Sequence, residues 1–270
     1  MLKRFLKSFK FVLILIFVLL ISFISYKLYD YYTSDENKAF VKEINTKVTE
    51  TKKEKLSVSD KTQDPKVEVK PEQKKESEKF KLAKQTNSEI IAFIKINDTR
   101  IDYPVLQTKD NDFYMTRNVK KEKDRNGSIF ADYEVSIKDD PDNLIIYGHH
   151  MRNKNMFHDL SKFRDGRFFN NHRYFNIEFE DHTRKYEVIL LAVVNLENEG
   201  VFEYNTHLNW SENMNAEKYV KAFRSYQKNS RDVKVESKDK LLTLSTCAYE
   251  YKDGRLVIVT KEAFLTFIYN

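Results

Sequence analysis

The stretch Leu241-Leu242-Thr243-Leu244-Ser245-Thr246-Cys247 is an apolar, β-prone run that ends in the only cysteine of the 270-residue chain. Its composition and length are typical of a buried strand. A single cysteine cannot form an internal disulfide, so Cys247 is either a small buried hydrophobic residue or a reactive thiol. Its place at the end of a predicted strand, in a chain that also carries paired histidines and Arg255, favours a nucleophile.

The composition indicates one sizeable domain with accessory segments. Hydrophobic residues make up 41% of the chain and aromatic residues 14%, which is enough for a real core. The net charge of +6 comes largely from lysines near the N-terminus and between residues 42 and 84. No basic motif is interleaved with aromatic residues, so we expect no nucleic-acid partner.

The N-terminal region has the pattern of a membrane anchor. Residues 11–26 carry no charge, Lys10 and Lys27 bracket them, and residues 11–29 approach the ~20 apolar residues that a spanning helix needs. No small-residue cleavage site follows, which argues against a removed signal peptide. Four basic residues precede the span, and the positive-inside rule then predicts that residues 1–10 are cytoplasmic. We expect a single-pass protein of the cell membrane with the rest of the chain outside.

Residues 30–76 are dominated by lysine, glutamate, threonine and serine, with few apolar residues. Such a segment buries too little surface to offset its ordering entropy. We expect an extended, partly disordered extracellular linker with helical stretches, which holds the domain away from the membrane. The folded domain is expected over residues 77–270.

Within that domain the hydrophobic pattern predicts many short strands and few helices. The expected strands cover residues 90–96, 101–106, 127–132, 143–148, 174–180, 185–195, 240–247 and 255–260. Helices are expected over residues 77–84 and 213–228, the second capped by Ser211. The pattern predicts a mainly β fold, a barrel or sandwich with an N-terminal helix and an inserted helix before the cysteine strand.

Two segments supply partners for a thiol nucleophile. Tyr147-Gly148-His149-His150 follows a predicted strand, which places a histidine at a strand end. Arg255 lies eight residues after Cys247, across a polar turn, so a hairpin would set the two side by side. A histidine can activate a thiol, and a guanidinium can stabilise a developing oxyanion.

Two further inferences concern metals and substrate. The six histidines and one cysteine have no spacing that suits zinc, so we expect neither a metal nor another cofactor. Ser245 shares one face of its strand with Cys247 by the period-two rule, and it is a candidate substrate-binding residue.

Together these motifs resemble the sortases, the cysteine transpeptidases of Gram-positive bacterial surfaces. The segment Thr243-Leu244-Ser245-Thr246-Cys247 is similar to their TLxTC signature, and an arginine follows downstream as in the family. Similarity to class B extends to four other segments: residues 101–105, 110–114 and 127–133, and Tyr147–Met151 followed by Met156-Phe157. The resemblance covers residues 88–260 and implies a β-barrel of about eight strands.

The resemblance also implies a reaction and its residues. Cys247 would attack the carbonyl after threonine in a C-terminal sorting motif of surface proteins, giving a thioacyl enzyme. His149, which directly follows the glycine, would serve as acid and base, and Arg255 would bind the oxyanion or the substrate threonine. The acceptor would be an amine of a peptidoglycan precursor or cross-bridge.

Two alternatives stay open at this point. A cysteine endopeptidase that releases its acyl group to water would share every catalytic residue. A non-catalytic barrel that binds at the cell surface would leave the coincidence of cysteine, histidine and arginine unexplained.

Overall fold

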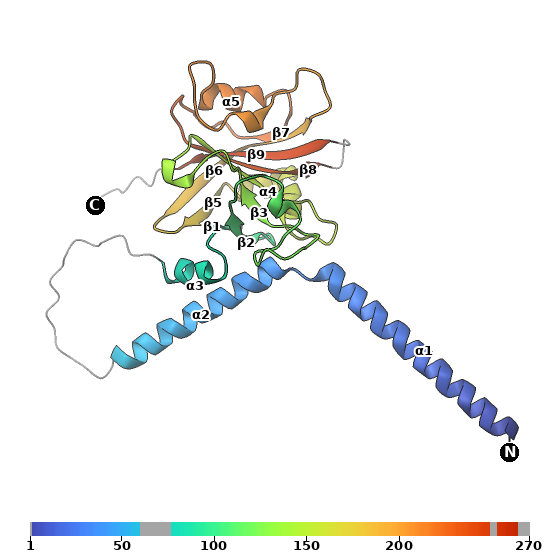
Figure 1. The fold of residues 1–270 in the computed structure, drawn as a ribbon. Helices are drawn as coiled ribbons and strands as arrows, with labels where there is room; N and C mark the ends of the chain where they lie inside the picture. Colours follow the sequence, from blue (N-terminus) through green and yellow to red (C-terminus); the bar gives the residue numbers. More distant parts are fainter. Residues whose placement is uncertain (1, 60–76, 249–252, 264–270) are drawn as a thin grey trace. The chain divides into compact units, whose positions relative to one another are not determined.

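The computed structural model describes residues 2–59, 77–248 and 253–263. The chain divides into two compact units, Met1–Asp35 and Glu36–Asn270. The first unit is the helix α1 (Leu2–Thr33), drawn in dark blue in Figure 1. Its segment Lys10–Tyr29 is long and apolar enough to cross a membrane, and none of it is buried in the protein. The expected anchor is therefore present as a candidate spanning helix.

The second unit is built on a nine-stranded sheet ordered β5-β1-β2-β3-β4-β8-β9-β6-β7 (Figure 1). A further pairing between β5 and β6 closes eight of these strands into a barrel. The strands are β1 (Ile90–Lys95), β2 (Asp102–Leu106), β3 (Ile129–Ala131), β4 (Asn143–Tyr147), β5 (Tyr174–Phe179), β6 (Thr183–Asn195), β7 (Gln227–Ser230), β8 (Leu241–Ala248) and β9 (Gly254–Glu262). The predicted barrel of eight strands is confirmed.

The ninth strand, β7, was not expected. Its sequence, Gln-Lys-Asn-Ser, has no apolar alternation, and the strand is exposed along most of its length. It pairs with β6 near Leu190–Ala192 and is stabilised by that ladder rather than by burial. Such pairing leaves no hydrophobic signal in the sequence.

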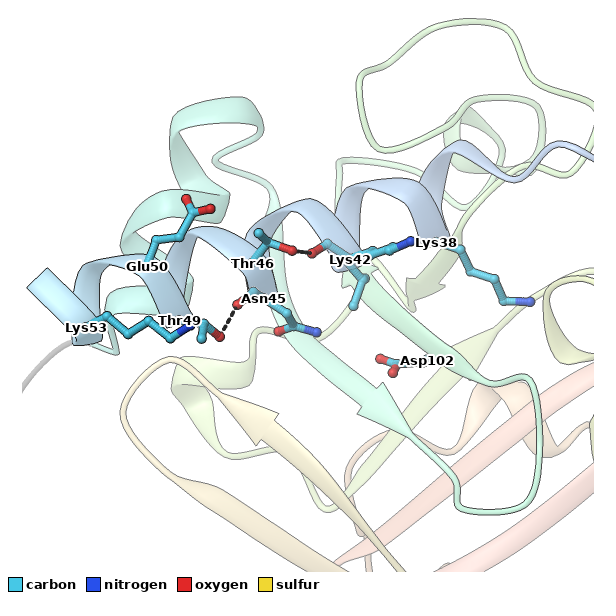
Figure 2. A pocket seen from close by; sticks show the side chains of 9 residues that line it. Lys38, Lys42, Asn45, Thr46, Thr49, Glu50, Lys53 and Asp102 are labelled. Carbon is cyan, nitrogen blue, oxygen red and sulfur yellow. Dashed lines mark hydrogen bonds between the residues drawn. The ribbon is translucent and has the colours of Figure 1, made fainter.

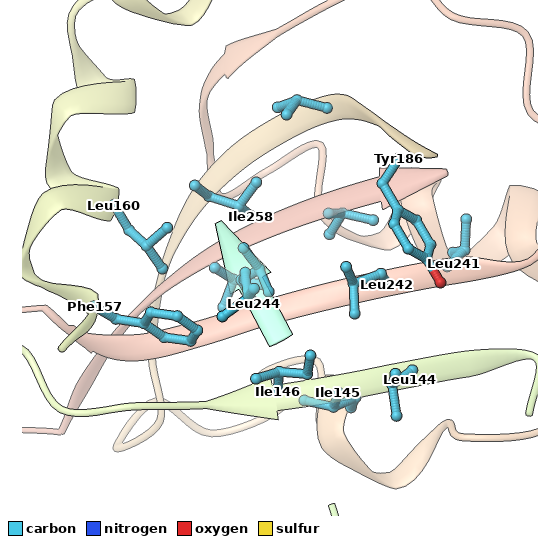
Figure 3. Close-up of a cluster of buried hydrophobic side chains, with 14 of the residues drawn as sticks. Leu144, Ile145, Ile146, Phe157, Leu160, Tyr186, Leu241, Leu242, Leu244 and Ile258 are labelled. Atoms are coloured by element: carbon cyan, nitrogen blue, oxygen red, sulfur yellow. The ribbon is translucent and has the colours of Figure 1, made fainter. Parts of the chain in front are cut away.

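The interior of the barrel is filled by the continuous apolar runs of its central strands. Side chains from β4 and β8 face those from β6, β9 and the 3₁₀ segment η3 (Phe157–Arg164) (Figure 3). Leu242, Leu244 and Ile258 are fully buried. Because β4 and β8 are buried over nearly all their length, they form a rigid base for the residues at their ends.

Helical segments cover the barrel and fill its connections. They are α2 (Glu36–Ser59), α3 (Glu78–Thr86), α4 (Gly166–Asn171), α5 (Ala216–Ala222), η1 (Phe113–Met115), η2 (Ile137–Asp139) and η4 (Tyr204–Thr206). The helix expected over residues 213–228 is shorter than predicted. Its cap is Asn215, whose side chain accepts from the Lys218 N–H, whereas Ser211 accepts from Met214 in the preceding turn.

The segment expected as an extended linker is helical over α2 and belongs to the second unit. Phe40, Val41 and Ile44 are buried in a second hydrophobic cluster that includes Phe80 of α3 and Phe93 of β1. Three apolar residues among many lysines and glutamates were too weak a pattern to indicate docking. The folded unit therefore begins at Glu36, and residues 60–76 of the expected linker lie outside the described residues.

The docking of α2 predicts a stability effect. Phe40→Ala should lower the free energy of unfolding by about 3–5 kcal/mol, because it removes a buried ring and leaves a cavity. Lys52→Ala, at an exposed position of the same helix, should change it by less than about 0.5 kcal/mol. Urea unfolding followed by circular dichroism measures both. Equal stability of the two variants would mean that α2 is not part of the folded unit in solution.

Candidate active site

The hairpin of β8 and β9 places Cys247 and Arg255 opposite each other. The two residues are direct register partners, as the turn length predicted. Gly254 pairs with Ala248 at the last step of the ladder, and a Cβ at Gly254 would lie 2.6 Å from the Ala248 carbonyl oxygen. A glycine is therefore needed for the strands to approach here. Cys247 is partly exposed, so its thiol is within reach of a substrate.

The parallel pairing of β4 with β8 brings the histidine segment to the same end of the barrel. Tyr147 is the register partner of Ser245, and the Gly148 N–H donates to the Ser245 carbonyl over 3.2 Å. His149 lies two residues after Tyr147, and Cys247 lies two residues after its partner Ser245. The two residues therefore come at the same position along the paired strands. Gly148 leaves no room for a side chain, since a Cβ would lie 2.9 Å from the Phe157 ring.

His149 is held through both its backbone and its ring. The Phe157 N–H donates to the His149 carbonyl over 2.9 Å, and the ring Nε2 lies 2.7 Å from the Met115 carbonyl oxygen. Because a carbonyl only accepts, Nε2 carries the hydrogen in this contact. Nδ1 is then the nitrogen that can gain and lose a proton in a reaction.

His150 contacts the cysteine residue through its main chain. Its Nδ1 lies 3.0 Å from the Cys247 carbonyl oxygen, and its ring packs edge-on against His158 with centroids 4.6 Å apart. The hydrogen bond runs from the imidazole to the carbonyl. His150 therefore holds the end of β8 in place.

Arg255 makes only local contacts with the described residues near it. Its Nη1 donates to the Gly254 carbonyl over 3.1 Å, and its Nη2 lies 3.5 Å from Asp253 Oδ1. The Asp253 side chain is 58% exposed, and ion pairs in such positions are weak. These contacts restrain the guanidinium only weakly.

Ser245 has a partner that the sequence did not indicate. Its side chain is 2% exposed, and its Oγ lies 2.8 Å from the hydroxyl of Tyr204 in η4. Burial raises the pKa of Tyr204, whereas the Ser245 hydrogen bond and the charge of Arg255 act in the opposite direction. A tyrosine in the connection between β6 and β7 carries no motif that could have identified it.

One groove of about 600 Å³ runs along α2, where Lys38, Lys42 and Lys53 face it from the helix and Asp102 from β2 (Figure 2). Among residues 2–59, 77–248 and 253–263, no group of three or more histidine, cysteine or acidic side chains is placed to hold a metal.

A closed β-barrel with a reachable thiol beside an arginine and a histidine defines a class of cysteine enzymes. The sortase domain matches residues 94–263. The chain is 39% identical to sortase B of Listeria monocytogenes over 177 residues, which cover 65% of this chain and 70% of the relative.

Solved structures agree with this match. Sortase B of Clostridium perfringens superposes with a TM-score of 0.62 at 36% identity, covering 68% of this chain and 99% of that chain. A substrate complex of Staphylococcus aureus sortase B gives a TM-score of 0.62 at 27% identity, with 70% and 86% covered. The chain belongs to the sortase family, and the structures it resembles are class B sortases. It is a sortase-type cysteine transpeptidase of surface proteins, which confirms the resemblance seen in the sequence.

The two histidines should differ in their effect on turnover. If His149 is the acid–base group, as the sequence predicts, His149→Ala should lower kcat by at least about 100-fold. His150→Ala should cost about tenfold or less, which corresponds to the loss of one hydrogen bond. His150→Asn should recover most of that loss, because its amide N–H can replace Nδ1–H. Steady-state cleavage of a sorting peptide measures all three, and the opposite ranking would contradict the assignment.

Proposed function

We propose that this sortase cleaves the C-terminal sorting motif of surface proteins after threonine and joins them to an amine of the peptidoglycan. The observation that carries the proposal is the register of three strand ends. Cys247 is paired with Arg255 on one side, and the residues after Tyr147 lie beside it on the other. A nucleophile, an anion-binding group and a proton carrier then meet at one place.

In the proposed reaction the Cys247 thiolate attacks the threonine carbonyl carbon and forms a C–S bond. The tetrahedral intermediate collapses, the C–N bond breaks, and the leaving amine takes a proton from His149 Nδ1. The acceptor amine then attacks the thioester and gives its proton to His149. The C–S bond breaks, and Cys247 is restored with a new amide as product.

Arg255 stabilises the oxyanion of both tetrahedral intermediates in this proposal. Its guanidinium turns from its contacts with Gly254 and Asp253 toward the substrate oxygen. Ser245 is proposed as a substrate contact, and its hydroxyl would exchange the Tyr204 bond for one to the peptide. The permanently charged guanidinium of Arg255 and the neutral hydroxyls of Ser245 and Tyr204 offer two kinds of hydrogen-bonding group. Together they suit the polar backbone of a substrate peptide in an extended conformation.

The enzyme is proposed to be anchored by residues 11–29, with residues 1–10 cytoplasmic and the catalytic unit facing the cell wall. The candidate span Lys10–Tyr29 and the basic residues before it support this topology. Protease added to intact cells stripped of wall should then reach the catalytic unit. Its full protection would contradict the proposed orientation.

A panel of sorting-motif peptides, incubated with and without amine acceptors, tests the function. Transpeptidation predicts that an added amine appears in the product and raises turnover. An enzyme that is a cysteine hydrolase gives the free acid regardless of amine. Binding without cleavage would indicate a surface-binding module and would refute the proposal.

Cys247→Ala should abolish cleavage while the far-ultraviolet circular dichroism of the barrel stays unchanged. The reason is that the thiolate alone can form the thioacyl intermediate. Mass spectrometry should detect an adduct of a thiol-reactive sulfonate on Cys247 in the wild type, together with loss of activity. Residual cleavage by the alanine variant at a substantial rate would rule out Cys247 as nucleophile.

Arg255→Lys should be nearly as damaging as Arg255→Ala, with a fall in kcat of about 100- to 1000-fold. Lysine keeps the charge but lacks the planar pair of donors. Both variants should still be alkylated at Cys247, which serves as the control for an intact thiol. Wild-type turnover of the lysine variant would mean that Arg255 supplies charge alone.

A further inference from the structure

Asn37, near the start of α2, is a buried polar residue inside a largely apolar contact. Its side chain is 1% exposed. Its Nδ2 donates to the Gly127 carbonyl over 2.9 Å, and its Oδ1 accepts from the Val119 N–H over 2.9 Å. Because a carbonyl only accepts and a backbone N–H only donates, these two contacts fix the orientation of the amide.

Gly127 and Ser128 carry this contact to η1. The Ser128 hydroxyl lies 3.1 Å from Asn37 Oδ1, and the Ser128 N–H donates to the Tyr114 carbonyl over 2.9 Å. Gly127 has a φ of +59°, and a Cβ there would lie 2.6 Å from the Met115 carbonyl oxygen. The two residues that Asn37 holds therefore pack directly on the peptide groups of Tyr114 and Met115.

The Met115 carbonyl is the acceptor for the ring of His149, 2.7 Å from Nε2. The main chain of His149 is fixed independently, by its hydrogen bond from Phe157. The orientation and tautomer of the ring therefore depend on Met115, and the position of Met115 depends on the residues that Asn37 holds.

A structural role alone does not account for the amide. Phe40, Val41 and Ile44 already attach α2 to the barrel through buried apolar surface. Burying an amide brings a desolvation cost that its hydrogen bonds only offset. What the amide adds is direction, since its hydrogen bonds to the Gly127 carbonyl and from the Val119 N–H set one register between α2 and the loop that supports the histidine.

We propose that Asn37 is a positioning residue for His149, and that docking of α2 couples the segment beside the membrane to the active site. This inference rests on the role proposed for His149. Residues 30–35 separate the candidate span from α2, and even fully extended they cover only about 20–22 Å. A force or contact that pulls the start of α2 away from the barrel therefore removes the support of Met115. The His149 ring can then rotate.

The full chain in detergent micelles, with ¹⁵N-labelled histidine, tests the coupling. Asn37→Ala is compared with Asn45→Ala, which removes an exposed asparagine from the same helix. Asn37→Ala should lower kcat between about 10- and 100-fold, with KM changed less than about twofold, because the ring is misplaced while the peptide still binds. The His149 ring nitrogens should change from one tautomer to a mixture. Asn45→Ala should match the wild type in all three measurements.

A loss of thermal stability in Asn37→Ala with wild-type kcat and ring signals would make Asn37 merely structural and overturn the inference. Ser128→Ala covers the case in which Asn37→Ala does not fold. This variant removes the Ser128 hydroxyl from the series of contacts between Asn37 and Met115. It should lower kcat by about threefold and change the His149 ring-nitrogen signals as Asn37→Ala does. Unchanged kcat and ring signals in that variant would also overturn it.

His149→Ala separates this inference from the proposed function. Wild-type turnover in that variant would refute the acid–base role of His149. The ring-nitrogen signals of Asn37→Ala would still report whether α2 sets the tautomer, because they do not depend on turnover.

Discussion

The parallel pairing of β4 with β8 is the constraint on which the active site depends. It joins segments about a hundred residues apart, and buried polar side chains set its register. Thr243 donates to Asn143 Oδ1 over 2.9 Å, and Asn143 Nδ2 donates to the His207 carbonyl over 2.9 Å. A slip of one residue would leave these groups unpaired and turn the buried faces outward. The same register puts the residues after Tyr147 beside Cys247.

Support for the reactive groups comes from their backbones more than from direct contacts between side chains. His150 holds the Cys247 carbonyl, Phe157 holds the His149 carbonyl, and Met115 holds the His149 ring. Among the described residues, Arg255 by contrast has only local and weak partners. In the proposed reaction, such a site keeps the nucleophile and the acid–base group fixed and leaves the anion-binding group able to follow the charge as it develops.

The second unit consists of more than the barrel, since α2, which was expected to be part of a linker, also belongs to it. Because α2 is docked, only residues 30–35 lie between the candidate span and the folded unit, where the sequence had indicated a long spacer. A lysine-rich groove runs along α2 of this unit (Figure 2).

The sequence by itself determined the eight barrel strands, the family, and the hairpin that pairs Cys247 with Arg255. These follow from local periodicity, turn length and short motifs, which are encoded in neighbouring residues. Only the tertiary structure decided the ninth strand, the docking of α2, and the contacts of Ser245 and His149 with Tyr204 and Met115. Each of these joins residues far apart in the chain, and burial or hydrogen bonding across such distances leaves no periodic pattern in either segment.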